Sequence, residues 1–178
     1  MKKIFLSTAL ITFSIINCWA QLTHSSDFVR IILPNGVHKL SKLQADAIVP
    51  RFKLPGKVVK SQGPPNVYQM DNVTLGLYNV NVNPLYGDLI REKSYKDESH
   101  LFLQQYGNKT YKSVIRDFGE NQALIINYSL DGIGHYWFFY RNNEKTLGQA
   151  GKMDYKTADH DKAEAFLNNV LNNIQFTK

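Results

Sequence analysis

"SLDGIGHYWFFYR", residues 129–141, carries the strongest structural signal in the chain. Asp131-Gly132 is typical of a two-residue β-turn, and the aromatic run after it is typical of a strand, so this stretch predicts a β-hairpin. Successive side chains of a strand point to opposite faces. One face then carries His135, Trp137, Phe139 and Arg141, and the other carries Tyr136, Phe138 and Tyr140. Because both faces are large and apolar, we expect a core strand of a sheet covered on both sides, with Phe138 and Phe139 both buried.

The segment "KMDYKTADHDKAEAFLNNVLNNIQF", residues 152–176, predicts an amphipathic helix near the C-terminus. Its apolar residues recur at helical spacing, and they are Ala163, Phe166, Leu167, Val170, Leu171 and Ile174. Asp161 and Glu164 have the spacing of a capping box. We expect the helix to pack on the sheet, and the final "IQF" to dock at a sheet edge.

The other segments of the chain are predicted to form strands and short helices. The periodicity predicts strands at 28–33, 72–82, 111–118, 122–129, 135–141 and 146–155. It predicts a short helix at 40–48 and two helical pieces at 85–106, the second of which is anchored by Leu101, Phe102 and Leu103. The strand at 72–82 changes phase near Tyr78, which indicates a bulge or burial of both faces. The fold class is therefore α+β, a mostly antiparallel sheet flanked by helices in an α/β/α sandwich.

This order of elements, with the terminal helix running into "NNIQF", resembles the Mog1/PsbP-like family over residues 45–176. The resemblance implies an antiparallel sheet between helical layers. Members of that family include photosystem accessory proteins, a small-GTPase binder and bacterial envelope proteins or chaperones. It therefore implies binding rather than catalysis, and it brings no catalytic motif to this chain.

The first twenty residues are typical of an export signal. Lys2 and Lys3 precede an apolar run from Ile4 to Ile16, and Ala20 occupies a position that signal peptidase favours. We expect residues 1–20 to be cleaved and residues 21–178 to form one domain. In the alternative, Cys18 is acylated and anchors a lipoprotein. On either route the mature domain has no free thiol, which excludes disulfides, a cysteine nucleophile and cysteine metal ligands.

The charge pattern does not indicate nucleic-acid binding. Loss of Lys2 and Lys3 lowers the formal charge from +6 to +4, and the other basic residues are scattered rather than clustered. The apolar run of the signal is too short to span a bilayer comfortably, and no other membrane span is predicted.

The sequence contains no recognisable catalytic or metal-binding motif. Asp159, His160 and Asp161 form the one compact cluster of possible ligands, and acidic residues there are better explained as helix-capping groups. A glycosidase needs two carboxylates at a defined separation. The sequence offers candidates for such a pair but does not define the distance between any two of them, and they are Glu92, Asp97, Glu98, Asp117 and Glu120. We therefore predict no catalytic residue, no metal site and no cofactor.

The predicted function is that of an exported, non-catalytic binding or accessory protein, periplasmic or secreted, whose partner is another protein or a small envelope ligand. The alternative is a hydrolase with a dispersed active site. If a face of the aromatic strand is open, the ligand-binding candidates are His135, Trp137 and Arg141. A hydrolase is expected to gather His135, His100 or an acid pair in one cleft, whereas a binding protein is not.

The export signal generates a direct prediction. We expect the protein recovered from its native host to begin at Gln21 and to lie outside the cytoplasm, because signal peptidase cleaves after small residues such as Ala20. N-terminal sequencing and intact mass measure this. A full-length cytoplasmic product contradicts it, and a chain that begins at a diacylated Cys18 identifies the lipoprotein route instead.

Overall fold

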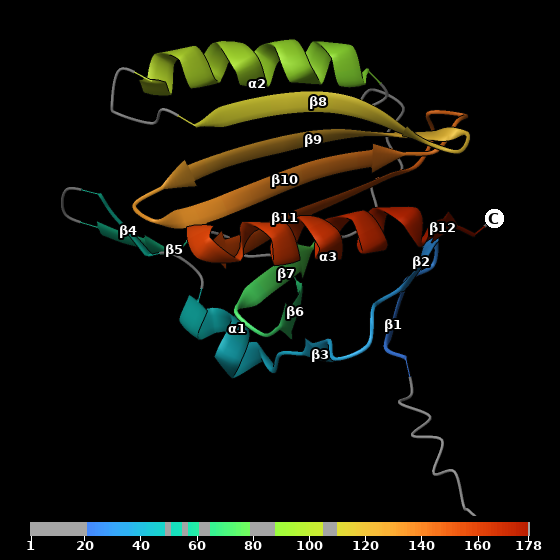
Figure 1. The fold of residues 1–178 in the computed structure, drawn as a ribbon, viewed down its shortest axis with the longest axis horizontal. Helices are drawn as coiled ribbons and strands as arrows, with labels where there is room; N and C mark the ends of the chain where they lie inside the picture. The colour runs from blue at the N-terminus through green and yellow to red at the C-terminus, as the bar shows by residue number, and fades with distance from the viewer. Residues whose placement is uncertain are drawn as a thin grey trace, which may run out of the picture.

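The computed structural model describes residues 21–48, 51–54, 57–60, 65–78, 88–104 and 110–177. Its main element is a seven-stranded antiparallel sheet with the order β3-β6-β7-β11-β10-β9-β8 (Figure 1). The strands are β3 (His38–Lys39), β6 (Asn66–Met70), β7 (Val73–Leu77), β8 (Tyr111–Phe118), β9 (Asn121–Leu130), β10 (Ile133–Arg141) and β11 (Gly148–Lys156). A separate hairpin pairs β4 (Arg51–Leu54) with β5 (Lys57–Lys60).

Strand β10 is an inner strand of the sheet and pairs along its whole length with β9 on one side and β11 on the other. Asp131 and Gly132 connect β9 to β10 with φ angles of 51° and 79°. Two consecutive left-handed residues make the tight turn whose twist matches that of the paired strands. The hairpin predicted from Asp131-Gly132 is confirmed.

Two glycines in β10 and β11 each lie beneath an aromatic ring of the neighbouring strand. Gly134 is paired with Tyr155, and Gly151 is paired with Phe138. A Cβ atom would lie 2.2 Å from Tyr155 Cζ at position 134 and 2.3 Å from Phe138 Cζ at position 151. No side chain fits at either glycine without displacing the ring, so both pairs favour the observed alignment of the two strands.

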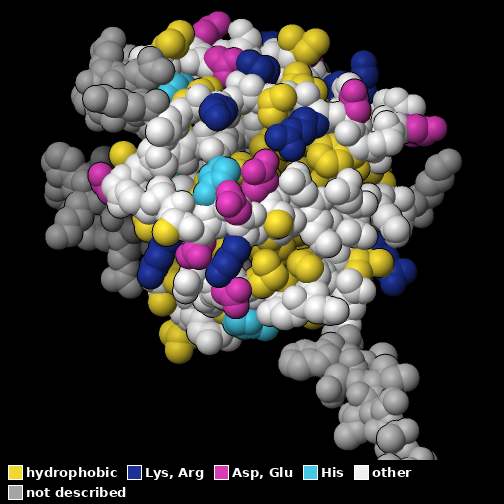
Figure 2. All heavy atoms as spheres, viewed as in Figure 1, with side chains coloured by type: hydrophobic (Ala, Val, Ile, Leu, Met, Phe, Trp, Pro, Cys, Tyr) yellow, Lys and Arg dark blue, Asp and Glu magenta, His cyan; other side chains and the backbone are white. Residues whose placement is uncertain are grey.

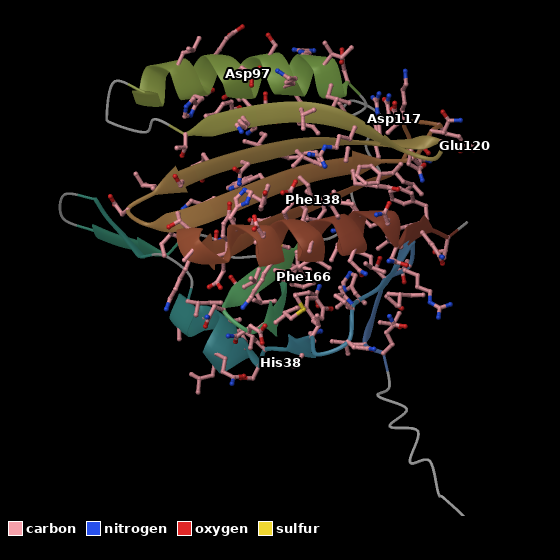
Figure 3. The ribbon with its side chains drawn as sticks, viewed as in Figure 1. His38, Asp97, Asp117, Glu120, Phe138 and Phe166 are labelled. Carbon is pink, nitrogen blue, oxygen red and sulfur yellow. The ribbon has the colours of Figure 1, made fainter. Side chains whose placement is uncertain are left out.

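One face of the sheet is covered by α3 (His160–Asn172) and by a three-stranded sheet of β1 (Thr23–Ser25), β2 (Val29–Ile32) and β12 (Ile174–Phe176). Figure 1 shows α3 across the front of β10 and β11, and the outer surface on this side mixes acidic, basic and hydrophobic side chains (Figure 2). Phe138 of β10 and Phe166 of α3, labelled in Figure 3, belong to one buried core. The helix buries Ala163, Phe166, Leu167, Val170 and Leu171.

The opposite face is covered in part by α2 (Leu89–Gln104), which runs along β8 (Figure 1) and packs on β8 and β9. A second, smaller core lies beneath it. Its buried members are Leu89, Leu124 and Ile126, with Tyr111, Ile115, Tyr128, Trp137 and Phe139 packed around them and partly buried. The strands beyond β10 on this face, β11, β7 and β6, are not part of that core.

The observed architecture confirms the α+β class, with a mostly antiparallel sheet between helices and the C-terminal amphipathic helix packed on it. Strands were predicted at 111–118, 122–129, 135–141 and 146–155, and each occurs within two residues of the predicted bounds. The expected export signal at 1–20, including Cys18, lies outside the described residues. Within the described part of the chain, no helix combines the length and the apolar character needed to cross a bilayer.

Two helix predictions need correction. Residues 89–104 form one helix rather than two pieces, and Leu101 does not anchor it because 61% of that side chain is exposed. The helix is attached instead through Leu89 and through polar contacts of Asp97. The capping box predicted for α3 is wrong, because Asp161 already lies inside the helix. The N-cap residue is Asp159, and its side chain makes no capping hydrogen bond.

Three other expectations are met only in part. The short helix α1 (Lys42–Ile48) is present, but its apolar side chains face solvent, with Leu43 82% exposed. Ile174 is buried in β12 rather than in the helix, and "IQF" pairs with β2 of the small sheet. The strand predicted at 72–82 is seen as β7, which buries Val73, Leu75 and Leu77 on one face and leaves Thr74 half-buried on the other, and residues 79–82 lie outside the described residues.

The aromatic strand also differs from expectation on one face. Tyr136, Phe138 and Tyr140 are buried as predicted, whereas Phe139 and Trp137 are only half-buried. The expectation that Phe138 and Phe139 are both fully buried is therefore wrong for Phe139. The reason is that α3 and the small sheet together close one face, while α2 closes only the β8 and β9 side of the other.

This difference predicts unequal costs for two adjacent truncations. Phe138→Ala removes a fully buried ring over Gly151 and is expected to lower the free energy of unfolding by about 3–5 kcal/mol. Phe139→Ala is expected to cost about half as much, because part of that ring already contacts water. Urea unfolding of both variants measures the difference. Equal losses would show that α2 encloses its face as completely as α3 does.

Candidate functional site

A cavity of about 370 Å³ lies on the α2 side of the sheet, where β6, β7, β10 and β11 pass beyond the helix. Its polar lining consists of Thr74, Asp131, His135, Lys152 and Asp154, and its apolar lining consists of Ile48, Val67, Leu130 and Ile133, with Gly76 on the floor. The floor residues come from the strands, whereas Ile48 ends α1 and residues 130–133 form the β9–β10 turn. This size falls in the range of small-ligand sites.

The closest polar contact on the floor joins His135 to Asp154. Their strands pair so that the two residues lie directly opposite each other, and His135 Nδ1 lies 2.8 Å from Asp154 Oδ1. An ionised carboxylate only accepts hydrogen bonds, so Nδ1 carries the proton and donates it to Asp154. Thr74 of β7 donates to the main-chain oxygen of Asp154 at 3.4 Å. Asp154 thus connects three strands of the floor.

Lys152 completes the charged group. Its Nζ lies 3.7 Å from Asp154 Oδ2, and its side chain is 20% exposed. Burial acts to raise the pKa of Asp154, but the hydrogen bond from His135 and the positive charge of Lys152 together outweigh it and hold that pKa below its ordinary value. Asp154 is therefore ionised at neutral pH and already committed to His135 and Lys152.

Aromatic side chains hold the imidazole of His135 from one side. The Tyr128 ring stacks on it with centroids 4.8 Å apart and an interplanar angle of 28°. Trp137, two residues along β10, packs with Tyr128 around the small core beneath α2. Burial raises the pKa of Tyr128, so its hydroxyl stays protonated. The ring of His135 is thus fixed by Asp154 at one edge and by Tyr128 on one face.

The structure brings one of the three candidates from the aromatic strand into the cavity. His135 lines it, Trp137 lies in the core beneath α2, and Arg141 donates to Gln122 at 2.7 Å near the opposite end of the strand. Arg141 stands six positions after His135 along β10, a distance of roughly 20 Å. The three therefore share a face of β10 without sharing one pocket.

Lys152 and Asp154 were not among the site residues predicted from the sequence. Both lie in a strand that was predicted, and both stand two residues apart on one face of it. A charged pair in the interior of a central strand is an unusual feature that could have drawn attention to them. Their partner could not be identified, because the sequence does not define the register between β10 and β11.

A second polar cluster attaches α2 to β8. Asp97 accepts hydrogen bonds from Tyr111 and Ser113 of β8 and from Lys93 of its own helix. His100 is 5% exposed and stacks on the Tyr111 ring at 3.8 Å. Burial acts to raise the pKa of Asp97, but the bonds from Lys93, Ser113 and Tyr111 lower it overall. This cluster lies under the helix and lines no described cavity.

The other groups considered from the sequence do not converge on a site. Figure 3 places Asp97 on α2 and places Asp117 and Glu120 near the end of β8, so Asp97 does not share a cleft with the other two. Near the start of α3, His160 contacts Tyr136 and Asp159 pairs with Lys162. Across the described ranges of the chain, no group of three histidine, cysteine, aspartate or glutamate residues is placed to hold a metal ion.

Comparison with known proteins identifies the fold and nothing finer. No protein-family model matches the chain, and no curated protein matches it. Its structure is similar to the solution structure of cyanobacterial PsbP (CyanoP) from a Synechocystis species, with a TM-score of 0.55 and 11% sequence identity over 94% of this chain and 99% of that chain. A likeness at this identity establishes the fold alone. The PsbP-like fold expected from the order of elements is confirmed.

The lowered pKa values of Asp154 and Asp97 predict acid sensitivity. A carboxylate whose pKa is lower in the folded than in the unfolded protein stabilises the fold above the ordinary Asp value of 3.8, and that contribution is lost as the pH falls through the folded pKa. Asp154→Asn is expected to reduce stability at pH 7 and to flatten the loss of stability between about pH 5 and pH 3. Urea unfolding across this pH range measures both effects.

Asp131→Asn provides the matched control for this experiment. Asp131 is an exposed carboxylate beside the same cavity, with no hydrogen bond or ion pair to any described residue, and Asn accepts its left-handed backbone. The control should keep the wild-type pH dependence. An Asp154→Asn protein with the same slope as wild type would show that the contact with His135 contributes nothing to folding.

Proposed function

We propose that this chain is an exported, non-catalytic binding or accessory protein whose ligand occupies the cavity over β6, β7, β10 and β11. Residues 21–178 act as one domain, in the periplasm or outside the cell, and the partner is a small envelope ligand or a segment of another protein. Support for export comes from the sequence of residues 1–20, with acylation of Cys18 as the alternative route. Support for binding comes from the cavity and agrees with the PsbP-like fold.

The observation that carries the proposal is the combination of a polar floor with an exposed apolar rim. Ile48, Leu130 and Ile133 line one cavity and are 48%, 49% and 39% exposed. Single exposed apolar side chains are common on protein surfaces, but a group of them around a concave site with a few polar residues is typical of ligand binding. Covering this rim with an apolar ligand group removes it from water, at about 25 cal/mol per Å².

The three candidates of the aromatic strand take different parts in this proposal. His135 contacts the ligand directly. Trp137 takes part indirectly, because it packs around the same core as Tyr128, whose ring stacks on the imidazole. Arg141 takes part only with a partner long enough to follow β10 from the cavity towards the start of α2.

A hydrolase is the second candidate, because a carboxylate bonded to an imidazole is also the arrangement of a general base. The cavity does gather titratable groups, which is the feature expected of a hydrolase. However, no hydroxyl or thiol of a described residue forms a hydrogen bond with His135. A hydrolytic step would therefore require water as its nucleophile, and binding remains the simpler use of the site.

Binding in the cavity can be measured with Nile red, an uncharged apolar dye whose emission rises in apolar surroundings. We expect the chain 21–178 to bind the dye saturably at one site, and Ile133→Arg to weaken that binding at least tenfold by placing a charge on the apolar rim. Val114→Arg is the matched control, because Val114 is also 39% exposed but lies on β8, away from the cavity. The dye titrations give both affinities.

Two outcomes would contradict the proposal. Equal weakening by both substitutions, or unsaturable dye binding in a folded wild-type protein, would show that the cavity is not a binding site. Turnover of p-nitrophenyl acetate that exceeds free imidazole and disappears in His135→Phe and Asp154→Asn would favour the hydrolase. Circular dichroism of each variant establishes that it is folded.

A further inference from the structure

The outer edge of β8 has no partner strand among the described residues. This strand ends the order of the seven-stranded sheet and pairs with β9 alone (Figure 1). Its eight residues pair with β9 one for one, without a bulge, and none of them is proline. Bulges, prolines and covering elements are devices by which proteins protect such an edge from pairing. The edge of β8 lacks the first two, and its main-chain groups can pair with another strand.

The turn after β8 identifies which main-chain groups point outward. Gly119 and Glu120 form a two-residue turn, with Gly119 at a φ of 63°, and Phe118 is paired with Asn121 across it. The pair that closes such a turn is hydrogen-bonded, and hydrogen-bonded pairs then alternate with non-hydrogen-bonded pairs along the ladder. The residues that bond to β9 are therefore Lys112, Val114, Arg116 and Phe118. The residues whose N–H and C=O groups point outward are Tyr111, Ser113, Ile115 and Asp117.

The next turn of the sheet gives the same result independently. Leu130 and Ile133 close the Asp131-Gly132 turn, so the even-numbered residues of β9 bond to β10 and the odd-numbered residues bond to β8. Each odd-numbered residue of β9 is paired with an even-numbered residue of β8. The outward direction of the odd-numbered residues of β8 thus follows from two separate turns.

The side chains on one face of this edge form a basic and apolar row. Lys112, Val114 and Arg116 alternate along β8, and all three are exposed. Lys112 makes no hydrogen bond or ion pair with any described residue. Arg116 lies 3.4 Å from Asn168 and 3.9 Å from Glu164, and the side chains of this ion pair are 44% and 41% exposed. Ion pairs with such exposure are weak, so Arg116 remains able to contact a partner.

The register of an added antiparallel strand defines the partner that fits this row. Its residues opposite Lys112, Val114 and Arg116 would form the non-hydrogen-bonded pairs, whose Cα atoms lie about 4.5 Å apart and whose side chains approach most closely. Opposite charges in such pairs stabilise a sheet and like charges destabilise it. The favoured partner strand therefore carries an acidic, an apolar and an acidic residue at alternate positions.

A second copy of this chain does not fit the same edge. In a continuous antiparallel sheet formed by two copies of β8, residues of equal parity lie opposite each other. The two registers that pair seven residues place Lys112 and Arg116 opposite or diagonal to the same cations of the other copy. Like charges at these positions disfavour the dimer. Basic residues on this edge thus oppose self-pairing and favour an acidic partner.

We propose that the outer edge of β8 binds an extended acidic segment of another protein, which joins the sheet as an additional antiparallel strand. Antiparallel pairing continues the arrangement of every strand pair in this sheet. Two acidic side chains of the segment lie opposite Lys112 and Arg116, and an apolar side chain lies opposite Val114. This surface is separate from the cavity over β6, β7, β10 and β11, so it extends the proposed function to a second binding surface.

A fluorescein-labelled peptide, Thr-Glu-Thr-Val-Thr-Glu-Thr amide, tests the charge row by fluorescence anisotropy at low salt. We expect saturable binding to the chain 21–178, and Lys112→Glu is expected to weaken it by about fivefold or more because an attraction becomes a repulsion. Lys156→Glu is the matched control, because it makes the same charge change at an exposed residue at the end of β11 and should leave the affinity unchanged. Equal weakening by both variants would show that only net charge attracts the peptide, which overturns the inference.

A peptide with lysines in place of the two glutamates completes the charge test. It should bind Lys112→Glu more tightly than it binds the wild-type chain. The opposite order, or equal binding to both, overturns the assignment of the charge row. Circular dichroism establishes that each variant is folded.

N-methylation of the peptide tests the main-chain contacts. With the valine opposite Val114, the second threonine lies opposite Ile115 and donates its N–H to β8, whereas the N–H of the valine points away. A methyl group on the nitrogen of that threonine is expected to abolish binding, and the same group on the valine nitrogen should be tolerated. Equal effects of the two methyl groups, or loss with methyl-valine alone, overturn the antiparallel addition.

Amide hydrogen exchange locates the peptide without any substitution. The N–H groups of Ser113, Ile115 and Asp117 should exchange quickly in the free chain and slowly in the peptide-saturated chain, because they point outward from the sheet. Those of Lys112 and Val114, which bond to β9, should be slow in both. Unchanged exchange at Ser113 and Ile115 in the saturated protein overturns the site.

Two further measurements separate this inference from its rivals. Ile133→Arg, which closes the apolar rim of the cavity, should leave peptide affinity unchanged, and loss of peptide binding in that variant would place the peptide in the cavity and overturn the inference. A dimer in sedimentation experiments that excludes the peptide would identify a second copy as the occupant, with the same consequence. Failure of Nile red to bind refutes the proposed cavity function alone, because the peptide reports only on β8.

Discussion

The alignment of β10 with β11 is the constraint on which the rest of the structure depends. It is set by two aromatic rings that each lie on a glycine of the opposite strand, Tyr155 over Gly134 and Phe138 over Gly151. A shift by one residue would turn every side chain of β11 to the other face of the sheet. Met153 and Tyr155 would then leave the core beneath α3, and Lys152 and Asp154 would enter it as charges. The packing on one face and the polar floor on the other are thus consequences of one pairing.

The two faces of the sheet are closed by different means. On the α3 side the helix and a small sheet form a continuous apolar core, and buried hydroxyls such as that of Tyr155 are bonded, in that case to Asn127 at 2.8 Å. On the other side the described part of the core has three buried side chains, Leu89, Leu124 and Ile126. The helix is joined to β8 there through Asp97, Tyr111 and Ser113. A helix attached through a polar cluster covers only the strands that carry the matching groups. The strands beyond it keep their outer face open, and the cavity lies there.

The sequence predicts the architecture better than the site, for reasons visible in particular residues. The Asp131-Gly132 turn connects adjacent strands through two residues and so defines the pairing of β9 with β10. The connection from β10 to β11 is longer and is held by Asn142, whose side chain accepts from the main-chain N–H groups of Thr146 and Leu147, with Lys145 in a left-handed conformation. No short sequence motif identifies that loop, so the register of β11 against β10 could not be predicted. The residue opposite His135 could therefore not be inferred. The half-burial of Phe139 was missed because it depends on how far α2 extends across the sheet.

The contact of Trp137 with Tyr128 gives the molecule a natural optical reporter. The chain has two tryptophans, and Trp19 lies within the expected export signal, which leaves Trp137 as the single indole of residues 21–178. That indole packs around the same small core as Tyr128, whose ring is stacked on the imidazole at the cavity. A change in the position or charge of His135 is therefore transmitted through one ring to the fluorophore. Occupancy of the cavity becomes visible in the intrinsic emission of the unlabelled protein.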